Sequence, residues 1–198
     1  MKTSAVVWAI LLGLPVHCAM AQIKMASIDV AAWYSLIAVH SGKALEIQGG
    51  AQGLDGGRPL QQGEATGADN QLFQLKQIQS GYFEITAKSS GLVLEIKENS
   101  LKDHAPVQQN RASGKDNQLF ALARDSDGSY AIIAKSSGYG FDVAGGVTAL
   151  GNGVPVIVYP AGGAKNQRFR LVPAVNLPPA ARTTGQRGKR ATGGLQAC

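Results

Sequence analysis

The sequence predicts an all-β domain built from three copies of one unit. Glycine supplies 25 of the 198 residues, a share that is typical of a chain with many tight turns. Aliphatic and aromatic residues recur over short spans separated by Ser-Gly and Gly-Gly turns, which favours strands. No segment carries a sustained helical stripe with caps, so helices are expected to be minor.

The repeat is defined by landmarks that return in the same order three times. Each unit opens with an aromatic residue, reaches a glycine eight residues later and then a carboxylate, and continues through a proline to a closing Asn-Gln-x-Phe-x-Leu. The aromatic residues are Tyr34, Phe83 and Tyr130, and the glycines are Gly42, Gly91 and Gly138. The carboxylates are Glu46, Glu95 and Asp142, the prolines are Pro59, Pro106 and Pro155, and the closing motifs span 70–75, 117–122 and 166–171. The glutamines of the closing motifs are 47 and 49 residues apart, which indicates an internal repeat rather than chance.

Four strands are predicted in each unit. In the first unit they cover residues 34–39, 45–48, 60–62 and 71–78, and the proline stands at the front edge of the third strand, where a missing N–H is tolerated. A unit of about 47 residues cannot bury both faces of its own strands, so the three units must share one core. Closing twelve strands into a barrel also removes exposed sheet edges, and three four-stranded units of this kind form a β-trefoil. A three-bladed propeller has the same number of strands, but propellers typically have at least four blades.

The first 21 residues are predicted to be a secretory signal peptide. Lys2 precedes an apolar run over 5–16, and Ala19-Met20-Ala21 provides an Ala-x-Ala cleavage site. The alternative of a membrane anchor is disfavoured because the run is shorter than the roughly 20 apolar residues that span a bilayer. We therefore expect a secreted protein, extracellular or periplasmic, in which residues 22–32 lead into the first strand. Cys198 is then the only cysteine, and it is available for an intermolecular bridge that would form a dimer.

The positive charge is concentrated outside the predicted domain. The chain has a formal net charge of +6, but residues 28–172 hold 13 basic and 13 acidic residues. A neutral body argues against nucleic acid as a partner. Residues 173–198 contain Pro178-Pro179, four basic residues and few large apolar side chains, which is typical of a disordered tail. Such a tail either binds an anionic surface or is a solvated extension without a partner.

The landmarks resemble those of the ricin B-type lectins. The closing Asn-Gln-x-Phe is similar to the Gln-x-Trp signature of that family, with Phe in place of Trp. The stretch 137–143, Ser-Gly-Tyr-Gly-Phe-Asp-Val, resembles the family's Ser-Gly-x-x-Leu-Asp-Val. The resemblance covers residues 33–172, divided into repeats of about 33–81, 82–128 and 129–172. It implies a β-trefoil that binds sugars, a module found alone or attached to glycosidases and toxins.

Cysteines are missing from the positions at which many members of that family close a disulfide in each repeat. These positions hold Ala44 and Ala65, Val93 and Ala112, and Gly140 and Ala161. We therefore expect the domain to be held together by its apolar core alone. The phenylalanines that recur with the repeat are predicted to lie in that core: Phe73, Phe120 and Phe169.

A carbohydrate site is predicted in the third repeat. A sugar presents directional hydroxyls and one face of C–H groups, so its site needs a carboxylate, an amide and an aromatic ring. The resemblance assigns these parts to Asp142, Asn166 and Tyr159, with Gln167 beside the amide and Ile157 on the wall of the pocket. Each residue also has a structural interpretation, as a turn cap, a brace or an ordinary surface aromatic. The recurrence of the Asn-Gln pair in all three repeats favours a bracing role in addition to ligand binding.

The other two repeats each lack the ring and are predicted to be vestigial. The corresponding residues are Glu46, Asn70 and Gly63 in repeat one, and Glu95, Asn117 and Asn110 in repeat two. Glutamate is one methylene longer than aspartate, and without a ring nothing covers the apolar face of a sugar. His40 and His104 stand at non-equivalent places, so neither indicates a metal site or a catalytic base.

These observations leave two functions open, neither of them catalytic. The first is a secreted lectin whose ligand, by resemblance, is galactose-like. The second is a secreted protein-binding β-trefoil, such as a protease inhibitor or an interaction module, that has lost sugar binding. An enzyme is disfavoured, because no phosphate-binding loop, zinc spacing or nucleophile elbow is present and the trefoil and tail occupy the whole mature chain. No cofactor is expected.

Overall fold

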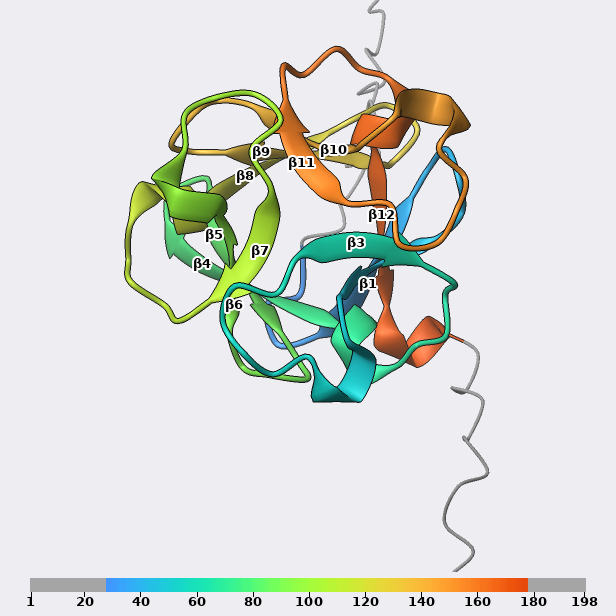
Figure 1. The fold of residues 1–198 in the computed structure, drawn as a ribbon, viewed down its shortest axis with the longest axis horizontal. Helices are drawn as coiled ribbons and strands as arrows, with labels where there is room; N and C mark the ends of the chain where they lie inside the picture. The colour runs from blue at the N-terminus through green and yellow to red at the C-terminus, as the bar shows by residue number, and fades with distance from the viewer. Residues whose placement is uncertain (1–27, 178–198) are drawn as a thin grey trace, which may run out of the picture.

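The computed structural model describes residues 28–177, which form twelve short strands joined by turns (Figure 1). The strands are β1 (Trp33–Ala38), β2 (Ala44–Ile47), β3 (Leu60–Gly63), β4 (Phe73–Gln79), β5 (Tyr82–Ala87), β6 (Val93–Ile96), β7 (Val107–Asn110), β8 (Phe120–Arg124), β9 (Tyr130–Ala134), β10 (Gly140–Val143), β11 (Val156–Tyr159) and β12 (Phe169–Pro173). The helical elements in this part of the chain are 3-10 turns: η1 (Gly50–Gln52), η2 (Asp69–Gln71), η3 (Lys97–Asn99), η4 (Asp116–Gln118), η5 (Gly146–Thr148), η6 (Lys165–Gln167) and η7 (Ala174–Asn176).

Six of the strands close into a barrel. Antiparallel pairs run from β1 to β4, β5, β8, β9 and β12, and β12 pairs back with β1. The other six strands form three hairpins, β2–β3, β6–β7 and β10–β11, one in each repeat. In Figure 1 the strands β3, β7 and β11 lie around a common centre. The predicted all-β β-trefoil is therefore confirmed, and a propeller is excluded because strands of successive repeats pair within one barrel.

The prolines stand directly before the third strand of each repeat, at the predicted front edge, and they also join the repeats. Pro59 bridges to Gln108, and Pro106 bridges to Ile157. Pro155 bridges to Gln61, which completes the circle. Each bridge connects the proline before the third strand of one repeat to the third strand of another repeat. Proline has no N–H, and none is needed at this edge position. The hairpins are therefore fastened to one another around the ring.

The fourth strand of the first repeat begins two residues later than predicted. Gln71 belongs to the 3-10 turn η2, and β4 starts at Phe73. The cause is the side chain of Gln71, whose Oε1 accepts a hydrogen bond from the backbone N–H of Thr66 at 2.8 Å. A side chain that is tied to its own loop favours a turn over an extended strand.

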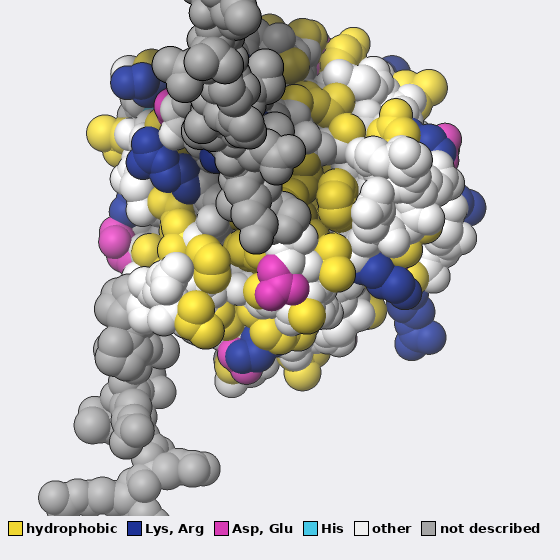
Figure 2. Space-filling view, turned by 180° about the vertical axis from the view of Figure 1, so that it is seen from behind, with side chains coloured by type: hydrophobic (Ala, Val, Ile, Leu, Met, Phe, Trp, Pro, Cys, Tyr) yellow, Lys and Arg dark blue, Asp and Glu magenta, His cyan; other side chains and the backbone are white. Residues whose placement is uncertain are grey.

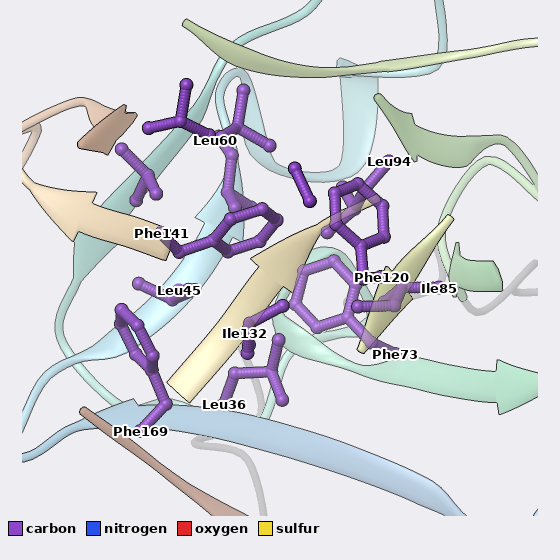
Figure 3. Close-up of a cluster of buried hydrophobic side chains, with 14 of the residues drawn as sticks. Leu36, Leu45, Leu60, Phe73, Ile85, Leu94, Phe120, Ile132, Phe141 and Phe169 are labelled. Carbon is purple, nitrogen blue, oxygen red and sulfur yellow. The ribbon is translucent and has the colours of Figure 1, made fainter. Parts of the chain in front are cut away.

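The core is apolar and draws on the same positions of each repeat (Figure 3). Phe73, Phe120 and Phe169 are fully buried, which confirms their predicted role. Phe141 joins them, and its ring meets that of Phe120 edge to face, with centroids 5.1 Å apart. Burial of this kind is the dominant stabilising contribution to a folded domain.

The loop between the second and third strands of each repeat is attached to the next repeat. The Nε2 amide of Gln109 donates to the carbonyls of Gly53 and Asp55, both at 2.8 Å. Gln62 makes the equivalent pair of bonds to the carbonyls of Ala149 and Gly151, both at 2.7 Å. In the third case the corresponding residue is apolar, Val158, and its hydrogen bonds to the loop join backbone groups.

Several predictions concern parts of the chain outside the described residues. These are the signal peptide, most of the lead-in, and residues 178–198 with Cys198. Order continues slightly past the predicted domain end, because Pro173 closes β12 and Ala174–Asn176 form η7. Between residues 28 and 177, no helix is long and apolar enough to cross a membrane. On the face seen in Figure 2, basic and acidic side chains are interspersed around apolar ones, as expected for a neutral body.

Candidate functional site

All five predicted site residues line one hollow of about 380 Å³ in repeat three. Strand β10 carries Asp142, and its partner β11 carries Ile157 and Tyr159. The antiparallel register sets Asp142 opposite Ile157, and because side chains alternate along a strand, Tyr159 projects from the same face as Ile157. The turn η6 brings Asn166 and Gln167 to this face. The structure thus unites the residues that the sequence assigned to a single site.

Asp142 is held by two amides and is 7% exposed. Asn166 Nδ2 donates to its Oδ1 and Gln167 Nε2 donates to its Oδ2, each at 2.9 Å. A carboxylate oxygen can accept two hydrogen bonds, so each oxygen retains room for one further donor. Burial raises the pKa of the Asp142 carboxyl above its ordinary value of 3.8, and the two amide hydrogen bonds oppose part of that rise.

The Asn-Gln pair also braces the fold, as its recurrence predicted. Asn166 Nδ2 donates to the carbonyl of Val143 at 3.2 Å. The matching bonds in the other repeats run from Asn70 to Ile47 at 3.1 Å and from Asn117 to Ile96 at 3.0 Å. The brace is therefore shared by all repeats. Of the three asparagines, Asn166 is the one whose amide also donates to the carboxylate of its repeat.

Tyr159 lies at the surface of the hollow and is 39% exposed. Its ring meets the imidazole of His104 edge to face, with centroids 4.9 Å apart and planes at 71°. His104 also lines the hollow, although it was not among the predicted site residues. One signal in the sequence could have indicated it: His104 occupies the position in its repeat that Gly57 and Gly153 hold in theirs. Among residues 28–177, no group of three His, Cys, Asp or Glu could hold a metal ion.

In repeat one, the carboxylate is turned toward the strand that lacks the ring. Glu46 accepts from Gln61 Nε2 and from Gln71 Nε2, both at 2.9 Å. Gln61 stands where repeat three has Ile157, so an amide binds the carboxylate at a place where repeat three has an apolar side chain. The residue at the ring position is Gly63, opposite Ala44.

In repeat two, a hollow of about 390 Å³ is present but its carboxylate is more heavily bonded. Glu95 Oε1 accepts from Gln108 at 2.8 Å and from Asn110 at 2.9 Å, and its Oε2 accepts from Gln118 at 3.1 Å. Asn110 occupies the ring position opposite Val93. Three amides therefore satisfy Glu95, against two for Asp142.

The fold and the hollow together define a β-trefoil module with a small polar site on one repeat. A family model described as ricin-type beta-trefoil lectin domain-like matches residues 27–110 and 69–159, and the chain belongs to this family. No curated protein sequence matches the chain.

Solved structures with the same fold agree with this assignment. The designed threefold-symmetric protein ThreeFoil is 38% identical, with a TM-score of 0.67, over 73% of this chain and 99% of its own. The exo-beta-1,3-galactanase 1,3Gal43A from Clostridium thermocellum is 26% identical, with a TM-score of 0.67, over 72% of this chain and 30% of its own. The Rhizoctonia solani agglutinin shares the fold at 21% identity and a TM-score of 0.61, over 72% of this chain and 94% of its own.

Proposed function

We propose that the protein is a secreted, non-catalytic carbohydrate-binding module with one site, in repeat three. One observation carries this proposal: the Asp142 carboxylate is oriented by Asn166 and Gln167 in the same hollow as the exposed ring of Tyr159. Membership of a lectin-like family supports it, and so does the similarity to part of an exo-beta-1,3-galactanase. Galactosides are accordingly the first ligands to test.

The geometry suggests how a sugar is held. The free lone pairs on the two Asp142 oxygens accept hydrogen bonds from two adjacent hydroxyls. The ring of Tyr159 covers the apolar face of the sugar, and Ile157 contributes apolar contact. A few hydrogen bonds in a small hollow correspond to a dissociation constant of roughly 10⁻³ to 10⁻⁴ M for a monosaccharide. Useful avidity then comes from multivalent ligands or from a dimer formed through Cys198.

Export is the second part of the proposal and rests on the sequence of residues 1–21. The N-terminal sequence of the protein recovered outside the cytoplasm should begin at Gln22. Recovery of an uncleaved chain that begins at Met1 would contradict a cleaved signal peptide.

The test is calorimetric titration of the mature chain with galactose, lactose and glucose. Asp142→Ala and Tyr159→Ala should each abolish binding, because one removes the hydroxyl acceptor and the other the apolar floor. Glu46→Ala is the matched control, since it truncates the equivalent carboxylate of repeat one. Unchanged binding in the Asp142 and Tyr159 variants would remove the site from repeat three.

A protein partner is the second candidate, favoured by a repeated surface feature. Three leucines at equivalent positions of the loops after η1, η3 and η5 are 51%, 61% and 54% exposed: Leu54, Leu101 and Leu150. Exposed large apolar side chains mark a protein contact where they form a contiguous patch. A tight protein partner recovered by affinity capture, together with no glycan binding, would favour this function over a lectin.

A further inference from the structure

His104 belongs to repeat two but is fastened to the strand that carries Tyr159. Its backbone N–H donates to the carbonyl of Val158 at 2.8 Å, and the N–H of Val158 donates back to the carbonyl of Ala105 at 3.0 Å. Pro106 forms a bridge with Ile157 on the same strand. The backbone on either side of Tyr159 therefore fixes where the imidazole lies.

The backbone of His104 adopts a left-handed conformation that a side chain disfavours. Its φ is +59°, and the equivalent positions of the other repeats are Gly57 at +82° and Gly153 at +75°. Glycine reaches this region without steric strain, whereas a residue with a β-carbon does not. Residues with such strain persist where the surrounding structure holds them, and they cluster at ligand-binding sites.

Of the three equivalent loops, the loop that carries a histidine is the one attached to the strand that carries an aromatic ring. The loop of Gly57 is attached to the strand that ends at Asn110, and the loop of Gly153 to the strand that ends at Gly63. The loop of His104 is attached to β11, which ends at Tyr159. The strained residue thus stands where the neighbouring repeat supplies a ring for a ligand.

We propose that the site is shared by two repeats, with His104 as a ligand-contacting residue that determines which sugars bind. This inference rests on the proposed carbohydrate-binding function. The imidazole Nδ1 lies 3.5 Å from Asp103 Oδ2, and Nε2 has no hydrogen-bond partner among the described residues. An imidazole nitrogen can donate to or accept from a hydroxyl. A sugar that lies on Tyr159 and binds Asp142 then presents a further hydroxyl, or a second sugar unit, to Nε2.

The test compares His104→Gly with the unmodified chain. Glycine is the residue that both other repeats carry here, so the variant should unfold at the same or a higher temperature. A glycan array of galactosides, glucosides and sialosides ranks the ligands, and the highest-ranked glycan is titrated. We expect about tenfold weaker binding of that glycan, the effect of one net hydrogen bond, together with a changed ranking. Lys102→Gly, in the same loop but outside the hollow, should keep both the affinity and the ranking.

The outcomes separate this inference from the function on which it rests. Unchanged affinity and ranking in His104→Gly, with binding lost in Tyr159→Ala, overturn the role of His104 and leave the lectin site intact. Absence of any binding by the unmodified chain overturns both proposals. Should His104→Gly unfold at a lower temperature, the titration is repeated at a temperature at which the variant is fully folded. Full affinity with an unchanged ranking in the folded variant overturns the inference, and a loss of affinity with a changed ranking supports it.

Discussion

In repeat one, the carboxylate of Glu46 occupies the space beside Gly63. A β-carbon at Gly63 would lie 2.5 Å from Cδ of Glu46 and 2.6 and 2.7 Å from its two oxygens. The carboxylate is kept there by Gln61 and Gln71, whose amides both donate to it. A ring at position 63 and this position of Glu46 therefore exclude one another. The longer acid and the absence of a ring in repeat one depend on each other.

Gly63→Ala should destabilise the domain, because the new β-carbon must displace a carboxylate that two amides hold. The cost of breaking one of those hydrogen bonds is about 1 kcal/mol. Combining Gly63→Ala with Glu46→Asp should restore part of that loss, because the shorter acid leaves room. Urea unfolding of the two single variants and the double variant measures the coupling. Strictly additive free energies of unfolding would show that the two side chains do not compete.

Acidification should weaken sugar binding at a pH above the ordinary aspartate range. Burial raises the pKa of the Asp142 carboxyl above 3.8, and only the ionised carboxylate accepts hydrogen bonds at both oxygens. Titration of the ligand between about pH 7 and pH 4 measures the midpoint of the loss. Asp142→Asn, which cannot ionise, should show no such midpoint. An affinity that is constant down to pH 4 would contradict the participation of the carboxylate.

Through Asp142, acidification should favour the folded state, although it weakens sugar binding. A raised native pKa means that the folded chain holds this proton more tightly than the unfolded chain does. The contribution of Asp142 to stability is therefore present below its unfolded pKa and is lost as the pH rises through its native pKa. Relative to Asp142→Asn, the unmodified chain should gain unfolding free energy as the pH falls, as measured by urea unfolding. The comparison with the variant cancels the opposite effect of Asp125 and Asp127, whose carboxyl pKa values are lowered by hydrogen bonds.

Phe120→Ala should lower the free energy of unfolding by about 3–5 kcal/mol, the usual cost of removing a fully buried ring. Phe120 is completely buried and packs against Phe141, so truncation leaves a cavity and removes an aromatic pair. Leu101→Ala provides the control, because that leucine is 61% exposed and its loss should change stability by less than about 0.5 kcal/mol. Denaturant unfolding of both variants measures the contrast, and similar losses in the two would refute the assignment of Phe120 to the core.

A disulfide should form between cysteines placed at positions 140 and 161. A β-carbon at Gly140 would lie 3.6 Å from that of Ala161, within the range found in disulfides. Gly140→Cys with Ala161→Cys should raise the unfolding free energy by about 3 kcal/mol when oxidised, according to the loop-entropy relation. The unfolding temperature with and without reductant measures the gain. Equal temperatures in the two conditions, with the bridge confirmed by mass, would mean that strain offsets the entropy.

The architecture could be predicted because it depends on features that recur along the chain. Phe73, Phe120 and Phe169 return in step with the Asn-Gln turn, and each is buried at the same place in its repeat. Hydrophobic burial and turn chemistry are local properties that a sequence records directly. The start of β4 was misplaced because the side chain of Gln71 ties the turn to its own loop, a competition that residue type alone does not reveal.

The site was predicted only within the boundaries of one repeat. Asp142, Tyr159 and Asn166 lie in one unit, so their order along the chain was enough to group them. His104 was missed because its contact with Tyr159 crosses from one repeat to the next, over 55 residues of sequence. The occupation of the ring position by Glu46 was equally hidden, because it depends on the conformation of a long side chain rather than on its identity.

The pairing of β1 with β12 brings the first and the last strand of the domain side by side. The register runs from Tyr34 opposite Pro173 to Ala38 opposite Phe169. A circularly permuted chain can therefore link these ends by a short connector and open instead at the turn around Gly81, between β4 and β5. The same closeness suits the domain for insertion into a surface loop of a host protein, where both junctions need only a narrow gap.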